Sequence, residues 1–267
     1  MPERDAALLA EVAAEAGDIA LRYWRRDPRR WEKDLGAGPV TEADLAVNDH
    51  LAARLRAARP DYGWLSEEGP EDPARLSAAR CFVVDPIDGT RAFIDGQEGF
   101  AVALAVVEAG RAIAGVVHLP ARRATYAAAL GGPARRNGQV IAAGEAALDG
   151  ATLLTAKSTL APEHWRGAAP PVRREFRSSL AWRLCLVAEG RFDATMSLRP
   201  VWDWDIAGAS LIAAAAGCRV TDRHGGPLVL NTPGAQVDGM LVAAPSLHGA
   251  LLARLGEAVT DGPGIAR

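Results

Sequence analysis

The stretch of residues 82–90 constrains this chain more than any other part of its sequence. It opens with an apolar, partly β-branched run, which predicts a buried strand. Asp85 and Asp88 follow, and the Gly-Thr step after them is typical of a turn into a helix N-terminus. Both acids should therefore lie at the carboxyl end of a strand, where α/β proteins tend to bind ligands. Because two neighbouring carboxylates repel each other, this segment predicts a divalent metal ion between them.

The bulk composition is ordinary for a globular protein and excludes several classes. The net charge of -3, without a Lys/Arg-rich run, argues against nucleic acid as a partner. No apolar run approaches the roughly 20 residues that span a bilayer, and acidic residues from Glu3 onwards interrupt any signal-peptide pattern. Cys81, Cys185 and Cys218 lack metal-type spacing, so we expect reduced, buried thiols in a cytoplasmic protein.

The first half of the chain has the pattern of two amphipathic helices beside a meander of strands. Apolar residues recur at helical spacing over residues 5–24, and Thr41 opens a second helical pattern that runs to about residue 58. The strand-like segments are residues 64–65, 82–84, 100–108, 111–118, 125–129 and 139–142. We therefore predict an α+β domain over residues 1–148, with a hairpin turn at Ala109-Gly110.

Strands and helices alternate in the second half, which predicts a three-layer α/β domain over residues 149–267. The expected strands are residues 152–156, 194–198, 219–221 and 240–244. The expected helices are residues 179–189, 205–216 and 246–259. No long linker separates the halves, so we expect them to pack closely with a cleft between them.

Several acids have a local structural interpretation beside any functional one. Thr41 followed three residues later by Asp44 fits a capping box at the start of the second helix. Asp203 directly precedes an apolar helical pattern and is predicted to be its N-cap. Glu67 stands in an adjacent pair of acids, a pattern that is most often a solvated loop.

The motifs taken together resemble the inositol monophosphatase family. A Glu-Glu loop at Glu67 is followed by Asp-Pro-Ile-Asp-Gly-Thr from Asp85, and then by Trp-Asp-Ile-Ala-Gly around Asp205 at the start of an Ala-rich helix. The resemblance extends over residues 40–245 and includes the segment that begins at Ser179. It implies a layered αβαβα sandwich and a magnesium-dependent, typically lithium-sensitive phosphomonoesterase.

The resemblance also implies roles for individual residues and two or three Mg²⁺ ions. The implied metal ligands are oxygen donors, as Mg²⁺ requires: Glu67, Asp85, the Ile87 carbonyl, Asp88 and Asp205. Thr90 paired with Asp44 would orient the attacking water, and Glu67 completes the catalytic set. The implied substrate contacts are Asp88, Gly89, Thr90, Ser179, Arg183 and Asp205. Lys33 matches a loop that in relatives approaches a further metal site.

The substrate within this family is less constrained by the sequence. Arg91 after the Gly-Thr step is closer to the 3'(2'),5'-bisphosphate nucleotidase branch than to inositol-specific members, and no acid lies between Asp193 and Asp203 to bind ring hydroxyls. Arg177 and Arg183 suit a second phosphate. We therefore expect a small phosphorylated substrate, in the order adenosine 3',5'-bisphosphate, an inositol monophosphate, then histidinol phosphate or another small ester.

Two further possibilities follow from the same comparison. An inactive metal- or phosphate-binding regulator would have lost part of the ligand set, whereas every acid of the set is present in this chain. Family members are commonly homodimers, so the resemblance makes a homodimer possible.

Overall fold

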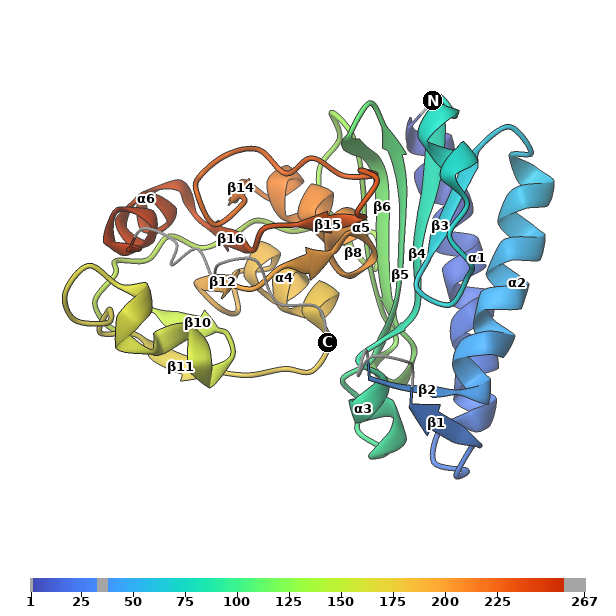
Figure 1. Cartoon of the computed structure of the whole chain (residues 1–267), viewed down its shortest axis with the longest axis horizontal. Coiled ribbons are helices and arrows are strands. Elements are labelled where there is room, and N and C mark those ends of the chain that lie inside the picture. The colour runs from blue at the N-terminus through green and yellow to red at the C-terminus, as the bar shows by residue number, and fades with distance from the viewer. Residues whose placement is uncertain (1, 33–37, 257–267) are drawn as a thin grey trace, which may run out of the picture.

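The structure is a computed structural model that describes residues 2–32 and 38–256. Its helices and sheets form five layers (Figure 1), because each sheet buries apolar residues on both faces. Helices α1 and α2 cover one face of a seven-stranded sheet, and α4 and α5 lie between this sheet and a second, five-stranded sheet. Helix α6 covers the outer face of the second sheet. The predicted αβαβα sandwich is confirmed.

The seven-stranded sheet contains the predicted meander, in the strand order β3-β4-β5-β6-β7-β8-β9. Its strands are β3 (Gly63–Ser66), β4 (Arg80–Asp88), β5 (Ala101–Glu108), β6 (Arg111–Leu119), β7 (Ala124–Ala129), β8 (Arg135–Arg136) and β9 (Gln139–Val140). All neighbours are antiparallel except β3 and β4, which run parallel. Ala109 and Gly110 have φ values of 49° and 77°, so both central residues of the predicted hairpin turn are left-handed, as a type I′ turn requires.

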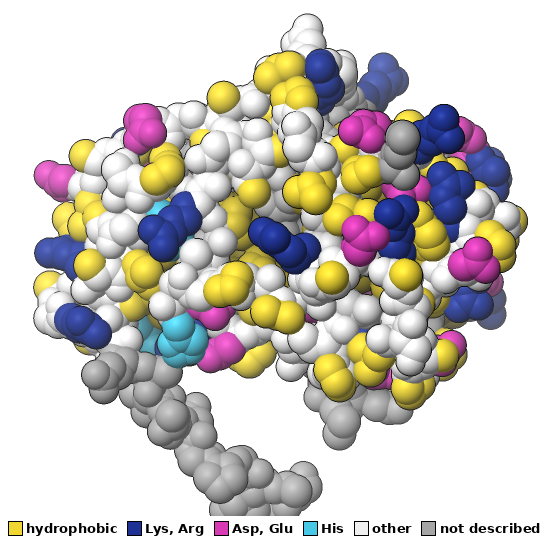
Figure 2. Space-filling view, turned by 90° about the horizontal axis from the view of Figure 1, so that it is seen from above, with side chains coloured by type: hydrophobic (Ala, Val, Ile, Leu, Met, Phe, Trp, Pro, Cys, Tyr) yellow, Lys and Arg dark blue, Asp and Glu magenta, His cyan; other side chains and the backbone are white. Residues whose placement is uncertain are grey.

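The first two helices pack their apolar stripes on this sheet. Helix α1 (Pro2–Tyr23) and helix α2 (Glu42–Ala58) are joined by a short hairpin of β1 (Arg30–Glu32) and β2 (Pro39–Thr41). Leu9 and Val12 from α1 pack with Leu51 and Leu55 from α2 in one buried cluster. On the face seen in Figure 2, positive and negative side chains are interspersed over this end of the molecule.

The second sheet has the strand order β11-β10-β12-β16-β14 and is mixed. Its strands are β10 (Thr152–Leu154), β11 (Arg173–Glu175), β12 (Ala194–Ser197), β14 (Arg219–Thr221) and β16 (Met240–Ala243). The remaining elements are α3 (Thr90–Ile94), α4 (Leu180–Ala188), α5 (Asp203–Ala215), α6 (Pro245–Arg254) and a small ladder of β13 (Val201–Trp202) with β15 (Gln236–Val237). The predicted last helix is thus shorter than expected, since α6 ends at Arg254, and residues 257–259 lie outside the described residues.

Helix α5 lies unusually close to the seven-stranded sheet because two glycines face each other there. A Cβ atom added at Gly208 would lie 2.4 Å from the Leu104 carbonyl oxygen, and one added at Gly115 would lie 2.5 Å from the Gly208 carbonyl oxygen. Neither position has room for a side chain. The backbone of α5 therefore rests directly on β5 and β6, which fixes the position of Asp205 one turn earlier in the helix.

The described residues also bear on two expectations about the whole chain. Cys81, Cys185 and Cys218 are free thiols and all three are buried, as predicted. Among the residues that the structure describes, none of the helices combines the length and apolar character that crossing a membrane requires. The division of the chain at residue 148 stays a prediction.

The close approach of α5 to the sheet predicts a large cost for a methyl group at Gly208. We expect Gly208→Ala to lower the free energy of unfolding by at least about 1–3 kcal/mol, because backbone atoms rather than flexible side chains must move. Gly249→Ala is the matched control, since Gly249 is an exposed helical glycine with open space around it. There the same change should stabilise by up to about 1 kcal/mol. Denaturant unfolding of both variants measures the difference, and equal effects would contradict the packing argument.

Candidate active site

Three predicted metal ligands meet where β4 ends and α5 begins. Asp85, Asp88 and Asp205 each offer a carboxylate oxygen, and these atoms lie within 4.8 Å of one another. In a regular strand, residues three apart point to opposite faces. The pairing of β4 with β5 shifts register between Asp85 and Asp88, and such an irregularity redirects side chains. The sequence placed both acids at the strand end, and this local distortion explains how both reach one cluster.

The cluster holds more negative charge than the described protein groups neutralise. Burial raises the pKa of Asp85 well above its usual value, and the charges of Glu67, Asp88 and Asp205 raise it further. Burial, Asp88 and Glu67 likewise raise the pKa of Asp205, against a hydrogen bond from the Trp202 N–H. Within the described residues, Asp85 Oδ1 is buried without a hydrogen-bond partner. A divalent cation with oxygen ligands would satisfy both the orphaned atom and the repulsion, so the residues fit the implied metal.

The carboxylate of Asp88 is held at the N-terminus of α4. It accepts hydrogen bonds from Ser179 Oγ at 2.6 Å, Ala181 N at 2.7 Å and Leu180 N at 3.1 Å. Burial raises the pKa of Asp88 to about 6, although these three hydrogen bonds oppose the shift. Ser179, predicted as a substrate contact, is the N-cap of α4 and positions Asp88. Its contact with substrate stays a prediction.

The two interpretations of Asp44 are compatible because each carboxylate oxygen has its own partner. Oδ2 accepts from Thr41 N at 2.8 Å and from Thr41 Oγ1 at 2.6 Å, which confirms the capping box. Oδ1 lies 3.5 Å from Thr90 Oγ1, a long contact, and the shorter of the two possible hydrogen bonds of that hydroxyl is to the Ile87 carbonyl at 3.1 Å. The structure thus brings together the threonine and aspartate that the family resemblance pairs. Their catalytic role stays a prediction.

Gly89 allows the turn after β4 to approach α4. Its φ of 95° lies in the left-handed region, which side chains other than glycine rarely adopt. A Cβ atom there would lie 3.0 Å from the Gly99 carbonyl oxygen and 3.2 Å from Ser179 N. The turn that carries Asp88 and Thr90 therefore sits directly against the segment that binds Asp88.

Glu67 lies near the three carboxylates but outside their closest group. Its N–H donates to the Val84 carbonyl at 3.1 Å, which ties its loop to β4. After burial, the charge of Glu67 has the largest effect among those that raise the pKa of Asp85. The solvated-loop interpretation is therefore the weaker one, and its ligand and catalytic roles stay predictions. Lys33 lies outside the described residues.

Asp203 is not the N-cap of α5, so that prediction is wrong. The helix begins at Asp203 and the cap position belongs to Trp202. The Asp203 carboxylate instead accepts from Asn231 N at 2.6 Å, in a loop 28 residues further along the chain. Burial raises the pKa of Asp203 to about 6, while the Asn231 N–H and the charge of buried Arg75 lower it. Asp203 therefore anchors the start of α5 to another segment.

Arg183, predicted as a substrate contact, packs against the segment before its own helix, which no sequence pattern indicates. Arg183 is buried on α4, and its Nε donates to the Arg177 carbonyl at 2.6 Å. Its guanidinium lies 4.3 Å from the ring centroid of Phe176. Burial lowers the pKa of Arg183, and the charges of Asp88 and Asp205 oppose this effect, so its guanidinium is within electrostatic range of the metal site. Direct contact of Arg183 with substrate stays a prediction.

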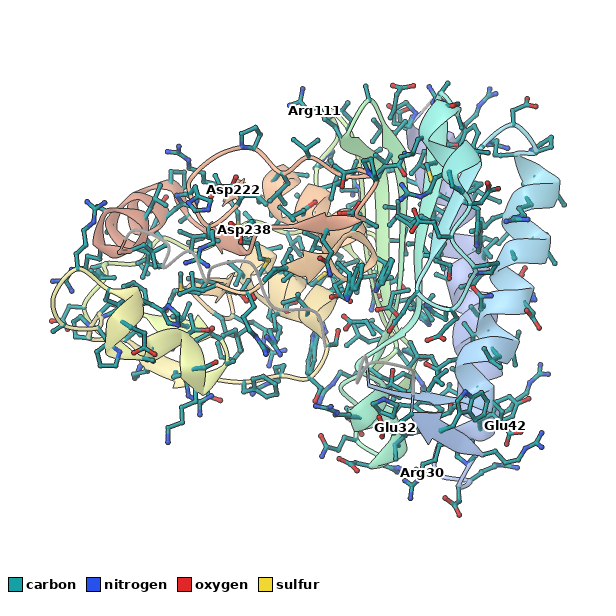
Figure 3. The ribbon with its side chains drawn as sticks, in the orientation of Figure 1. Arg30, Glu32, Glu42, Arg111, Asp222 and Asp238 are labelled. Atoms are coloured by element: carbon teal, nitrogen blue, oxygen red, sulfur yellow. The ribbon has the colours of Figure 1, made fainter. Side chains whose placement is uncertain are left out.

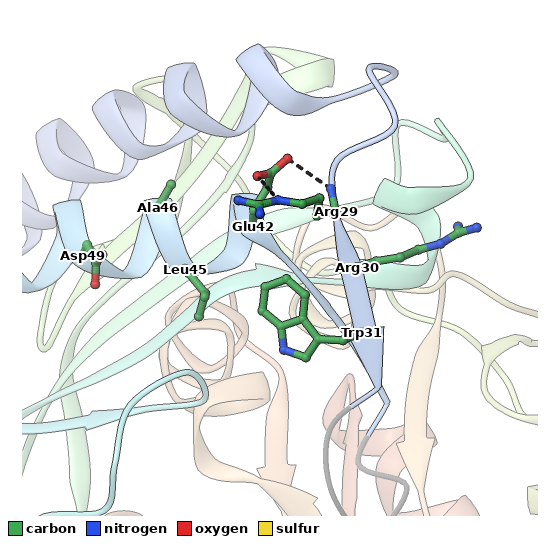
Figure 4. Close-up of a pocket in the computed structure, with 7 residues that line it drawn as sticks. All are labelled: Arg29, Arg30, Trp31, Glu42, Leu45, Ala46 and Asp49. Atoms are coloured by element: carbon green, nitrogen blue, oxygen red, sulfur yellow. Dashed lines mark hydrogen bonds and ion pairs between the residues drawn. The ribbon is translucent and has the colours of Figure 1, made fainter.

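One surface hollow and two other surface acids lack the features of the carboxylate cluster. A hollow of about 690 Å³ beside Trp31 and Leu45 contains none of the three clustered carboxylates, and the Glu42 carboxylate in it is paired with Arg29 (Figure 4). Asp222 and Asp238, labelled in Figure 3, lie on the second half of the molecule. Asp222 accepts from backbone N–H groups of its own turn, and Asp238 pairs with His224 at 2.8 Å. These acids have structural partners.

Comparison with known proteins agrees with this geometry. The inositol monophosphatase family matches over residues 1–260. The 3'(2'),5'-bisphosphate nucleotidase CysQ of Escherichia coli strain K12 is 30% identical over 224 residues, which cover 82% of this chain and 91% of that protein. An inositol-1-monophosphatase of Rhizobium meliloti is 34% identical over 198 residues, 70% of this chain and 73% of the relative.

A solved structure shows the same fold. The IMPase TM1415 of Thermotoga maritima superposes with a TM-score of 0.79 at 27% identity, over 95% of this chain and 96% of that one. The layers, the carboxylate cluster and the sequence similarity lead to one assignment. The chain belongs to the inositol monophosphatase family and is a phosphomonoester hydrolase.

Proposed function

We propose that this enzyme hydrolyses adenosine 3',5'-bisphosphate to AMP and phosphate, with Mg²⁺ as its metal ion. The observation that supports this most is the pairing of an acidic cluster with a segment rich in arginine. Asp85, Asp88 and Asp205 suit a metal-bound phosphate, Arg177 lies in the segment that leads into α4, and Arg183 lies within α4, the helix whose N-terminus binds Asp88. In a substrate with two phosphates, one phosphate can bind the metal at the acidic cluster and the other can bind the arginines. The similarity to a bisphosphate nucleotidase over most of the chain supports the same substrate.

The proposed metal ligands are the three clustered carboxylates with Glu67 and the Ile87 carbonyl. Bound Mg²⁺ supplies charge neutralisation for the phosphate and lowers the pKa of a water molecule. Inhibition by lithium, a property that the family resemblance implies, would act on this same set of ligands.

The protein groups then have separate tasks in an in-line hydrolysis. The N–H groups of Gly89 and Thr90 stand at the start of α3, where they are placed to bind phosphate oxygens. Thr90 Oγ1, between Asp44 and the Ile87 carbonyl, orients the attacking water and passes its proton toward Asp44. The water oxygen forms a bond to phosphorus while the bond between phosphorus and the ribose 3'-oxygen breaks, and that oxygen takes a proton from solvent water to leave as the 3'-hydroxyl of AMP.

An inositol monophosphate is the second candidate substrate. The inositol-1-monophosphatase similarity favours it, at 34% identity over a smaller share of the chain. Against it, residues 194–202 contain no acid that would bind ring hydroxyls. Histidinol phosphate is the third candidate, supported by the Gly-Thr-Arg pattern and by a histidinol-phosphatase of Chlorobaculum parvum that is 29% identical over 96% of this chain.

A comparison of three substrates tests the proposed function. With Mg²⁺, we expect phosphate release from adenosine 3',5'-bisphosphate with a kcat/KM at least about tenfold above that for inositol 1-phosphate or histidinol phosphate, because only the first has a second phosphate for the arginine segment. Phosphate release measured on all three under one set of conditions decides the order. A higher kcat/KM for either monophosphate would refute the proposed substrate.

Replacing the central carboxylate tests the proposed metal site. Asp85→Asn should lower phosphate release at least about 100-fold, because it removes a charge that metal and phosphate both depend on. Without metal the variant should unfold at a higher temperature than the wild type, since one charge leaves a repelling buried cluster. Exposed Asp149→Asn is the control. Thermal unfolding with and without Mg²⁺ measures the effect, and a variant that Mg²⁺ stabilises as much as the wild type would contradict the role of Asp85.

The Thr90–Asp44 pair predicts a kinetic signature. Thr90→Ala should lower kcat roughly 100-fold or more with a smaller change in KM, because the hydroxyl acts on the attacking water rather than on ground-state binding. Thr90→Ser retains the hydroxyl and should recover most of the rate. Steady-state kinetics of both variants give the test, and a change confined to KM would argue against a role in orienting water.

A further inference from the structure

Phe176 has an exposed aromatic ring in the short segment that leads to Ser179, a residue of the active site. Its side chain is 48% exposed, although large apolar side chains in this protein are mostly buried. It lies between β11 and Ser179, whose hydroxyl binds Asp88. Phe176 stands three positions before Ser179, so their Cα atoms are at most about 11 Å apart. That span suits the distance between the two ends of one nucleotide.

The guanidinium of Arg183 packs against one face of this ring. The Arg183 side chain is buried, its Nε donates to the Arg177 carbonyl at 2.6 Å, and its Nη2 donates to the Ser178 carbonyl at 3.4 Å. These bonds fix the guanidinium under Phe176, at 4.3 Å from the ring centroid. A cation on one face of a ring orients it and leaves the opposite face for a second flat partner.

We propose that the exposed face of Phe176 binds the purine base of the substrate, with Arg183 as the residue that positions the ring. This inference rests on the proposed function and specifies how the nucleoside is recognised. Bases stack on aromatic side chains without a need for matched hydrogen-bond donors. The base would lie on Phe176 while the 3'-phosphate reaches the carboxylate cluster.

Trp202 is the rival platform. Its side chain is 40% exposed and its other face stacks on Trp204, with ring centroids 4.6 Å apart and planes 9° from parallel. The surrounding charge distinguishes the two rings. Trp202 is followed directly by the acid Asp203, and Asp205 beyond it belongs to the proposed metal site. Phe176 stands in a segment with Arg173, Arg174 and Arg177, where Glu175 is the one acid between them. Charge complementarity therefore favours Phe176.

Removing the ring should affect only substrates that carry a base. Phe176→Ala is expected to lower kcat/KM for adenosine 3',5'-bisphosphate roughly 5- to 150-fold, the effect of one lost base–aromatic stack. Ribose 3,5-bisphosphate, which lacks the base, should be hydrolysed at the wild-type rate. Calorimetric titration with AMP in Mg²⁺ gives a readout without turnover, and its affinity should fall by a similar factor. Phe176→Trp should retain both properties, and Phe176→Leu should behave like Phe176→Ala.

Controls separate this inference from the proposed function. Leu130→Ala, which truncates another exposed apolar side chain, should leave both substrates unaffected. Equal losses on both bisphosphates in Phe176→Ala, or no loss on either, would overturn the base platform while wild-type turnover of the nucleotide upholds the function. A loss for the nucleotide alone in Trp202→Ala, with none in Phe176→Ala, would also overturn it. A wild-type enzyme that releases phosphate only from other esters would refute the proposed function itself.

Discussion

The three hydrogen bonds to Asp88 are the interaction on which the rest of the site depends. The first N–H groups of a helix have no partners within it, and Asp88 supplies an acceptor for two of those of α4 from a strand 91 to 93 residues earlier in the sequence. The same contact fixes the end of β4 against the second half of the chain. Because β4 provides Asp85 and Asp88 while α5 provides Asp205, neither half can form the carboxylate cluster alone.

This arrangement gives up stability for the sake of the site. Burying several carboxylates together is unfavourable, and the raised pKa values of Asp85, Asp88 and Asp205 express that cost. The favourable terms lie in the packing around the cluster, above all where the backbone of α5 at Gly208 rests on the sheet. Binding of a metal ion would raise the free energy of unfolding, because the ion interacts with the clustered carboxylates of the folded state and not with the separated carboxylates of the unfolded chain.

The parts of the fold that the sequence predicts are those governed by neighbouring residues. The capping box at Thr41 and Asp44, the hairpin turn at Ala109 and the strand that ends at Asp85 depend on residues within a few positions, so their patterns are readable. Asp203 was misassigned because an acid before a helix suits an N-cap, whereas its partner Asn231 lies 28 residues away. The contact of Arg183 with the loop before α4 was missed for a related reason, since it depends on how the chain folds back on the helix.

Charge asymmetry across the site restricts which esters can orient productively. One side carries the clustered acids, which accept a phosphate only together with a cation. The segment before α4 carries Arg173, Arg174 and Arg177, which in the proposed function supply the charge for a second phosphate. A monophosphate has one negative group, and the arginines then compete with the metal side for it. The proposed bisphosphate has one group for each side, so binding of its second phosphate would oppose reversed or displaced binding of the first. The carboxylates whose clustering is unfavourable would thus also orient the proposed substrate.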